Sequence, residues 1–544
     1  MGIRMAEIKL NLVWLGACVA LMLSGCGGQD NAGTANLSGQ VSAVNSSPSL
    51  GHSAASRFLE HGAMGASPAS VAQVRAQGIE GWINAQMKMA PTKIVTPESM
   101  VNYDDQRDKP ANERMRDFYH LNLHNTLIGG EDQLRIRTTW VLSNYLVVST
   151  RKIAEYGAIE YFNMLQTHAF GQYGDLLKSL TRSPAMGNYL DNNQNTKWQL
   201  NENYGRELMQ LFSVGLVQLN LDGTPKRDAS GKVLETYSQK DVIEITRALT
   251  GWVNVPNPTN LISNRNGPNY GKPMIENASR HDTDSKSFLG KTIPAGQSTT
   301  QDLDSLVEIL VTHPNTAPFV SLRLIQGMTT SDPSPAYLKR VATVFKDTKG
   351  NLNKVITAIL TDPEARAGDV YGKSTANFGR IKEPLLIFTS GFRGLGCKVA
   401  VKSTNKPNEV IRSYNQQPFN AYSVFNFYPP NHRTQGTNIL APEQKLLNSM
   451  EFSSRMNFFI WALENESTLN DAGCDVDTFK AAQAVSDEKL LDLMNERFFR
   501  GTLSASISKS LIDANKNMSN KKGLRLTGSI LDIAALTPAF GVSK

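Results

Sequence analysis

The chain has 544 residues, 40% of them hydrophobic, with 56 Lys and Arg against 49 Asp and Glu and a formal net charge of +7. The apolar fraction excludes a wholly disordered chain, and four cysteines in this length exclude a disulfide-stapled scaffold. The charge is small for the size, so we expect no nucleic-acid partner, and the length predicts two or more domains or one large helical body.

Residues 1–25 have the layout of an export signal. A basic start is followed by an almost entirely apolar run over 10–23 and then by small residues. The run is too short for a typical membrane span. Residues 23–26 (LSGC) are similar to the bacterial lipobox, in which cleavage precedes the cysteine and that cysteine carries lipid. We therefore expect residues 1–25 to be removed and Cys26 to anchor the protein in a membrane through several acyl chains.

The residues after Cys26 predict the membrane to which the protein is sorted and a flexible segment that follows the lipid. Gly27 stands where, by resemblance to the enterobacterial sorting rule, an Asp would favour retention in the inner membrane. Gly therefore favours the outer membrane of a Gram-negative host, with the periplasmic and cell-surface faces both open. Residues 27–52 are rich in Gly, Ser, Asn and Ala, cannot repay the entropy of ordering, and predict a flexible tether.

From residue 53 to 544 apolar side chains recur with the helical period, which predicts a mainly α, multi-helix, orthogonal or bundle-like body with little β structure. Residues 138–148 are interpreted as a central buried helix, and another helix begins at 237–241, where Ser238 and Asp241 have capping-box spacing. Further helical patterns run near 302–313, 315–328, 335–347, 352–362, 381–391, 443–464 and 487–499.

Two long segments, 253–300 and about 402–440, read as irregular. Irregular segments of this length in a helical body are often functional loops, although they can also be simple insertions. The first is also a possible break between two subdomains.

Residues 200–212 predict an amphipathic helix. On a helical wheel Leu200, Tyr204, Leu208 and Leu211 share one face, and Glu207 lies at its edge with Asn203. A half-buried carboxylate must be paired, metal-bound or protonated. Glu207 is therefore either a candidate catalytic acid or the partner of a nearby arginine: Arg206, Arg247 or Arg182.

An overlapping pattern indicates a possible calcium site. Asp191, Asn193, Asn195 and Glu202 occupy positions 1, 3, 5 and 12 of a twelve-residue loop, which is the oxygen-ligand spacing of an EF-hand. Thr196 stands at the position that needs glycine for the turn. The alternative is an Asn-rich turn with helix caps.

Histidine supplies the other candidates. His281-Asp282 lies in the first irregular segment and could be a catalytic base, a ligand or a surface pair. His120 and His124 are four residues apart, and we interpret them as a surface pair on a solvated amphipathic helix. The sequence has no HExxH pair, Gly-x-Ser-x-Gly elbow, P-loop or GxGxxG fingerprint, which disfavours a zinc hydrolase and the common nucleotide-binding folds.

The segment 201–215 (NENYGRELMQLFSVG) is similar to NENYARELMELFTLG, the hallmark of the bacterial family called domain of unknown function 1800. Five further motifs follow in the family's order: RALTGW at 247–252, HD at 281–282, KEP at 382–384, QQPF at 416–419 and SVFNFY at 423–428. The resemblance as a whole covers about residues 53–460. The resemblance implies an exported, mostly helical protein, often encoded beside an exported protein of sulfatase-like fold, which becomes a candidate partner. Asn201, Asn203, Arg206 and Arg247 are the candidate binding residues within these motifs.

Two segments depart from the family pattern. The usual His-rich WHNHF corresponds to LSNYL at 142–146, and the usual HLLxRxTFG corresponds to SRFLEHGAMG at 56–65. The first of these therefore has no histidine in this chain.

Three functional hypotheses follow. The first is a lipid-anchored envelope module that binds an extracellular polymer or a partner protein. The second is a hydrolase-like enzyme acting on an envelope polymer, with Glu207, His281 and Asp282 meeting in one cleft. The third is a calcium-stabilised surface module.

The four cysteines allow one lipid attachment site and at most one disulfide in the body of the protein. Cys18 leaves with the signal and Cys26 is expected to carry lipid, so only Cys397 and Cys474 remain in the body. In an exported compartment these two could form a disulfide.

Overall fold

The computed structural model of the chain describes residues 50–97, 109–256, 268–370, 373–399, 416–450, 466–516 and 537–544. The expected signal segment, Cys26 and nearly all of the expected tether lie outside these residues and stay predictions.

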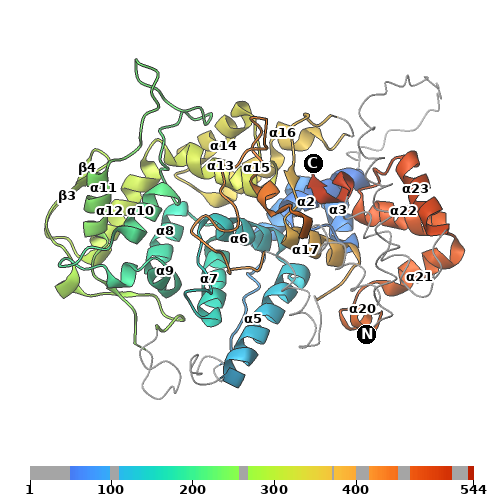
Figure 1. Ribbon diagram of the computed structural model, residues 1–544, viewed down its shortest axis with the longest axis horizontal. Helices are drawn as coiled ribbons and strands as arrows, with labels where there is room; N and C mark the ends of the chain where they lie inside the picture. The colour runs from blue at the N-terminus through green and yellow to red at the C-terminus, as the bar shows by residue number, and fades with distance from the viewer. Residues whose placement is uncertain are drawn as a thin grey trace. The chain divides into compact units, whose positions relative to one another are not determined.

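The described residues are mainly helical, as the apolar periodicity predicts (Figure 1). The α-helices are α2 (His52–Gly62), α3 (Pro68–Lys88), α5 (Lys109–Gly129), α6 (Gln133–Tyr145), α7 (Glu155–His168), α8 (Tyr173–Arg182), α9 (Pro184–Tyr189), α10 (Glu202–Gln210), α11 (Gln239–Ala248), α12 (Thr299–Thr312), α13 (Thr316–Met328), α14 (Pro335–Asp347), α15 (Leu352–Thr361), α16 (Pro363–Ala367), α17 (Pro384–Gly394), α20 (Glu466–Asp471), α21 (Val476–Val485), α22 (Asp487–Phe498), α23 (Ala505–Lys516) and α25 (Pro538–Gly541).

Short 3-10 turns and two-residue or three-residue strands complete the structure. They are η1 (Asn192–Gln194), η2 (Ala278–Arg280), η3 (Pro442–Leu446), β1 (Trp252–Val253), β2 (Ile275–Glu276), β3 (Lys286–Phe288), β4 (Lys291–Ile293), β5 (Arg380–Ile381) and β6 (Val542–Ser543). The strands form antiparallel pairs, β1 with β2, β3 with β4 and β5 with β6. Apart from Trp252, the residues of the first two pairs lie in the segment 253–300 that the sequence marks as irregular.

The predicted helices are found close to their expected bounds. α12, α13, α14, α15 and α22 each begin and end within three residues of the pattern that predicted them. The capping box at the start of α11 is also confirmed, with Ser238 and Asp241 exchanging backbone and side-chain hydrogen bonds. Each capped end supplies acceptors for backbone N–H groups that the helix itself leaves unpaired.

Two helix predictions need correction. The pattern at 381–391 belongs to α17, which begins at Pro384 because residues 380–381 pair instead with Val542–Ser543 near the carboxyl end. The pattern at 443–464 contains the 3-10 turn η3, and its residues 451–465 lie outside the described ones.

Helix α6 is the central buried helix that residues 138–148 predict. It begins earlier, at Gln133, and ends at Tyr145, and every residue from Gln133 to Ser143 is buried. α13 packs across it so closely that a Cβ on Gly327 would lie 2.3 Å from Val141 Cγ1. The glycine therefore allows two buried helices to approach without a cavity between them.

The expected surface pair His120 and His124 is wrong. Both side chains are buried on α5, where the His124 ring packs edge-on against Phe388 of α17 with ring centroids 5.6 Å apart. His124 Nδ1 donates to the carbonyl oxygen of His120 at 2.6 Å, and burial lowers the pKa of His124 to about 4. The helix is covered by a partner distant in sequence, which its own amphipathic pattern does not reveal.

Residues Ser49–Lys544 form one compact unit, and the possible subdomain break near 253–300 stays a prediction. Among the described helices, none combines the length and the apolar character that crossing a bilayer requires.

Candidate functional site

Helix α10 carries the Glu207 carboxylate at the edge of its buried face. Asn201 caps the helix by accepting the backbone N–H of Asn203 at 3.1 Å. Tyr204 and Leu208 are fully buried, as the wheel predicts, whereas Leu200 lies before the helix and is 38% exposed. Glu207 is thereby held half-buried between the core and the surface.

Glu207 has no salt-bridge partner among the described residues, which corrects the arginine alternative. Arg206 instead pairs with Glu202 at 2.7 Å, and Arg247 pairs with Asp282. The Oε2 atom of Glu207 is buried without a hydrogen bond. Burial raises the pKa of Glu207, and the charge of Arg206 opposes this only in part. A half-buried carboxyl group with a raised pKa is a candidate proton donor.

The four residues with EF-hand spacing each form hydrogen bonds or ion pairs with different protein groups. Asp191 pairs with Lys152 at 2.7 Å, and Glu202 accepts from Arg206 and Gln239. Asn195 is buried, where its amide donates to the carbonyl oxygen of Thr246 at 2.8 Å, and Asn193 donates to Asn188 at 3.0 Å. These contacts belong to an Asn-rich turn with helix caps, and in the described part of the chain no three His, Cys, Asp or Glu side chains are placed to hold a metal ion.

The Asp282 carboxylate is held by a fork of hydrogen bonds. Arg247 Nε donates to Asp282 Oδ2 at 2.8 Å and Arg247 Nη2 donates to Oδ1 at 3.2 Å. The same guanidinium also binds Glu244 at 3.0 Å. Burial raises the pKa of Asp282, but the hydrogen bond from Arg247 and its charge outweigh this, so the pKa lies below its ordinary value. Arg247 and Asp282 thus fasten the 281–288 segment to α11.

His281 is 1% exposed and faces inward. Its Nδ1 donates to the carbonyl oxygen of Thr250 at 2.8 Å, and its Nε2 lies 3.2 Å from Asp302 Oδ2 on α12. Lys286 Nζ donates to the same carboxylate oxygen at 2.6 Å. The hydrogen bonds and ion pairs of His281 and Asp282 do not include Glu207, so the expected meeting of these three residues is not among the contacts of the structure.

Several motif segments converge instead on Glu383, which lies at the start of α17. Arg380 and Gln416 both donate to its carboxylate, and Asn144 donates to Oε2 at 3.4 Å. Burial raises the pKa of Glu383, but the charge and hydrogen bond of Arg380 outweigh it, so the pKa is below its ordinary value. Glu383 is 1% exposed, which makes this network a closed internal contact between segments.

The adjacent Lys382 extends this network to α2. Its ammonium group donates to Glu60 at 2.9 Å, and Glu60 also pairs with Arg500 at 2.7 Å. The KEP motif therefore joins three segments: 56–65, 142–146 and 416–419. Two of these are the segments that depart from the family pattern, and each supplies one contact: Glu60 binds Lys382, and Asn144 binds Glu383.

The family model described as "Protein of unknown function (DUF1800)" matches residues 57–542. The chain belongs to this family. The match begins within α2 and covers nearly all of the helical body, in agreement with the resemblance carried by the motifs at 201–215 and 382–384. No curated protein and no solved structure matches the chain.

In this DUF1800 protein the segment after α6 also contacts the residues between the QQPF and SVFNFY motifs. Ser149 pairs with Asn420 as an isolated β-bridge, and the guanidinium of Arg151 lies 4.1 Å from the centroid of the Tyr422 ring. The next residue, Lys152, forms the ion pair with Asp191, whose other oxygen accepts from Asn203 at 3.4 Å.

We call the set Arg151, Lys152, Asp191, Asn203 and Tyr422 the 422 surface. Tyr422 is 71% exposed, and the other charged and amide side chains lie at least partly in solvent. Sequence reasoning selected Asp191 and Asn203 but missed Arg151, Lys152 and Tyr422. Their only local signal is that Tyr422 directly precedes the SVFNFY motif; the contact across about 270 residues is not visible in the chain.

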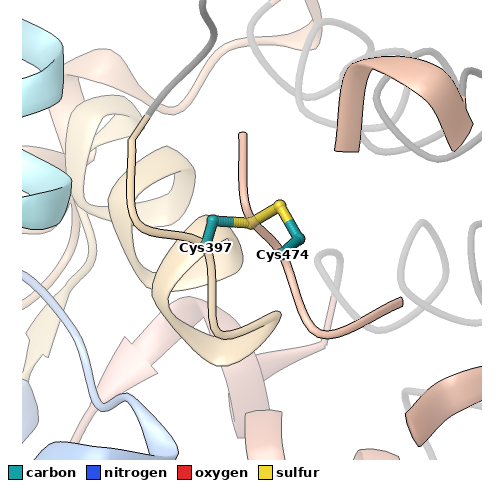
Figure 2. The surroundings of a disulfide bond; sticks show 2 residues. All are labelled: Cys397 and Cys474. Carbon is teal, nitrogen blue, oxygen red and sulfur yellow. A yellow bond between two sulfur atoms is a disulfide. The ribbon is translucent and has the colours of Figure 1, made fainter. Parts of the chain in front are cut away.

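Cys397 and Cys474 form a disulfide (Figure 2). It closes a separation of 77 residues and joins the segment after α17 to the turn between α20 and α21. The backbone N–H of Asp475 also donates to the carbonyl oxygen of Leu395 at 2.9 Å, so the bridge lies beside a direct backbone contact.

Proposed function

We propose that this DUF1800 protein is exported, lipidated at Cys26 and held on the outer membrane, where it binds an extracellular polymer through the 422 surface. The lipobox-like LSGC at 23–26 and the Gly-rich and Ser-rich composition of residues 27–52 support the proposed membrane location. The observation that carries the binding role is the Tyr422 ring, which is 71% exposed and has the Arg151 guanidinium 4.1 Å from its centroid.

A single exposed aromatic residue is ordinary, but Tyr422 has neighbours suited to a polymer ligand. Its ring offers a flat apolar face, and Phe425, which is 43% exposed, follows three residues later. Lys152 and Asn203 can donate hydrogen bonds, and Asp191 can accept them. A flat ring bordered by donors and acceptors can bind a sugar ring by packing against its apolar face and bonding to its hydroxyl groups.

The direct experiment is sedimentation of the purified full-length protein with insoluble polysaccharide and peptidoglycan fractions of a bacterial envelope. We expect saturable co-sedimentation that soluble fragments of the same polymer reverse. Sedimentation equal to that of an unrelated lipoprotein would contradict the proposal. Specific capture of an envelope protein without any polymer, such as one of sulfatase-like fold, would favour a partner protein instead.

The anchor has its own test. Cys26→Ala removes the only residue that the lipobox pattern allows to be lipidated, so we expect the variant to move from the membrane pellet to the soluble fraction after cell lysis. Cys18→Ala is the matched control, because Cys18 lies within the expected signal and should leave the distribution unchanged. An unchanged distribution of the Cys26 variant would remove the lipoprotein assignment.

A hydrolase is the second candidate, and the Glu207 carboxylate, which forms no salt bridge with any described residue, favours it. A carboxyl group with a pKa raised by burial is suited to general acid catalysis on a glycosidic or related bond. If Glu207 has this role, Glu207→Gln abolishes the release of soluble fragments from an envelope polymer, whereas Glu202→Gln on the same helix does not. Absence of fragment release by the unaltered protein would leave binding as the activity.

A further inference from the structure

A cavity of about 320 Å³ lies between α7, α8 and two loop segments. Its charged lining residues are Lys93, Glu160 and Arg182, and Tyr270 and Ser179 also border it. The volume is within the range of about 300–1,000 Å³ that is usual for small-ligand sites. None of the sequence motifs marks this cavity.

The loop that carries Lys93 is fixed to α7 on both sides of that residue. Asn163 Oδ1 accepts the backbone N–H of Ile94 at 3.0 Å, and its amide donates to the carbonyl oxygen of Ile94 at 2.8 Å. Gln166 donates to the carbonyl oxygen of Thr92 at 2.9 Å. Lys93 is therefore held at the cavity by its two neighbours and does not need a ligand to order its backbone.

The opposite wall is equally well supported. A Cβ on Gly157 of α7 would lie 2.7 Å from the Tyr270 ring, so only glycine lets the ring settle on this helix. Tyr156 contacts the same ring edge-on, with centroids 6.0 Å apart. The backbone N–H of Met274 donates to the carbonyl oxygen of Arg182 at 2.7 Å, which ties the end of this loop to α8. The cavity is thus bordered by anchored segments.

The three charged groups at the cavity are not held in short ion pairs with one another. Lys93 acts on Glu160 through its charge, which partly opposes the rise that burial gives to the pKa of Glu160. The guanidinium of Arg182 lies over the Trp252 ring, 5.8 Å from its centroid, which leaves its N–H groups able to bind a ligand. Two cations against one carboxylate give the cavity one net positive charge when His168 is neutral, and burial lowers the pKa of His168. A ligand with one negative charge is therefore favoured.

We propose that this cavity binds a sugar acid, that is, a hydroxylated ring bearing one carboxylate. Arg182 and Lys93 bind the carboxylate, Glu160 bonds to ring hydroxyls, and the Tyr270 ring packs against the sugar ring. Arg182 is suited to this role because a guanidinium can bind a carboxylate through two parallel hydrogen bonds. A free amino acid fits less well, because its ammonium would compete with Lys93 for Glu160.

This site is separate from the 422 surface, so it can be tested with a monosaccharide and without a polymer. Isothermal titration of the full-length protein with sodium glucuronate should show saturable binding at one site per chain. Arg182→Ala and Lys93→Ala should each weaken binding about tenfold or more, because each removes a charge-assisted contact. Lys339→Ala changes an exposed lysine on α14 and should leave the affinity within about twofold.

Thermal melting of the variants separates loss of binding from loss of fold. Lys93→Ala is the more decisive variant, since the Lys93 side chain is exposed and its backbone is held by its neighbours. Glucose, glycine and inorganic phosphate should each bind more weakly than glucuronate. The proposal is overturned if no saturable binding occurs, if any of these three binds as tightly as glucuronate, or if Lys93→Ala and Arg182→Ala both bind normally.

Discussion

At the scale of single residues, Asp302 illustrates how this protein stabilises charge inside a helical core. Its carboxylate is fully buried and accepts from Lys286, whose side chain is fully buried as well. Lys286 also donates to the carbonyl oxygen of Asp282. A buried pair of this kind costs much desolvation, so its members depend on each other more than exposed pairs do.

Lys286→Met should therefore be strongly destabilising. The variant leaves Asp302 buried without its cation, and loss of one partner of a buried pair costs about 3–5 kcal/mol in the free energy of unfolding. Lys349→Met is the control, because Lys349 and its partner Glu308 are 69% and 63% exposed, and such pairs contribute about 0–1 kcal/mol. Urea unfolding of both variants checks this, and equal losses would contradict it.

Removing the charge of Glu207 should have the opposite effect and stabilise the folded protein. Its pKa is raised in the folded protein, so the folded state binds its proton more tightly than the unfolded chain does. Ionised Glu207 therefore disfavours folding, and its contribution becomes unfavourable as the pH rises from the unfolded pKa through the folded pKa. Glu207→Gln should raise the free energy of unfolding at pH 7 by less than about 1 kcal/mol, because the half-exposed group is partly screened, and should raise the melting temperature accordingly.

The advantage of Glu207→Gln should disappear on acidification below the ordinary pKa of a glutamic acid, where the carboxyl is protonated in both states. Melting curves at neutral and acidic pH measure this difference. A variant that is less stable at pH 7, or whose advantage grows in acid, would show that Glu207 is a paired carboxylate. A stability gain at a polar motif residue would fit a functional role, since sites are often retained at a cost in stability.

At the scale of elements, helices with their own caps and stripes could be predicted, and those defined by distant partners could not. α14 begins at Pro335 after the cap Ser334, and both residues are visible in the sequence. The start of α17 depends on a strand pair with Val542–Ser543, and the burial of His120 and His124 depends on contacts from elsewhere in the chain. Local patterns hold no information on such contacts.

The disulfide is the element-scale feature with the clearest expected effect. Cys397–Cys474 ties α17 to α20 and α21 across 77 residues, and a bridge over a loop of this size typically contributes about 2–4 kcal/mol. Cys474→Ser, or reduction with dithiothreitol, should lower the melting temperature by several degrees. A full thiol titre with an unchanged melting temperature would contradict this account.

At the scale of the whole molecule, the sequence predicted the helical class and the family, and it named two of the five residues of the 422 surface as candidate site residues. It did not predict the Glu383 network, because Asn144, Gln416 and Lys382 are brought together only by the packing of α6, α17 and the 416–420 segment. Nor does motif order along the chain say whether His281, Asp282 and Glu207 share one cleft, because motif order carries no distance. Polar residues of the motifs lie both in buried contacts between segments, as Glu383 does, and at the surface, as Asn203 does.

Calcium should have no global effect on stability. Asp191 and Glu202 already pair with cations, so an ion would have to displace Lys152 and Arg206. A ligand that binds only the native state raises its stability. We therefore expect the same melting temperature in excess EDTA and in added calcium, measured by circular dichroism. A clear increase with calcium, lost in Asp191→Asn, would restore the EF-hand interpretation.

The central claim is that the Tyr422 ring binds an extracellular polymer, and the affinity of Tyr422 variants for an insoluble envelope polysaccharide tests it most directly. Tyr422→Phe keeps the flat ring and should bind with an affinity within about threefold of that of the unaltered protein. Tyr422→Ala should bind at least about tenfold more weakly, which corresponds to about 1.4 kcal/mol of binding free energy. Val485→Ala, at a residue that is 73% exposed on α21, is the control for exposure alone. Equal binding by Tyr422→Ala and Val485→Ala would contradict the account.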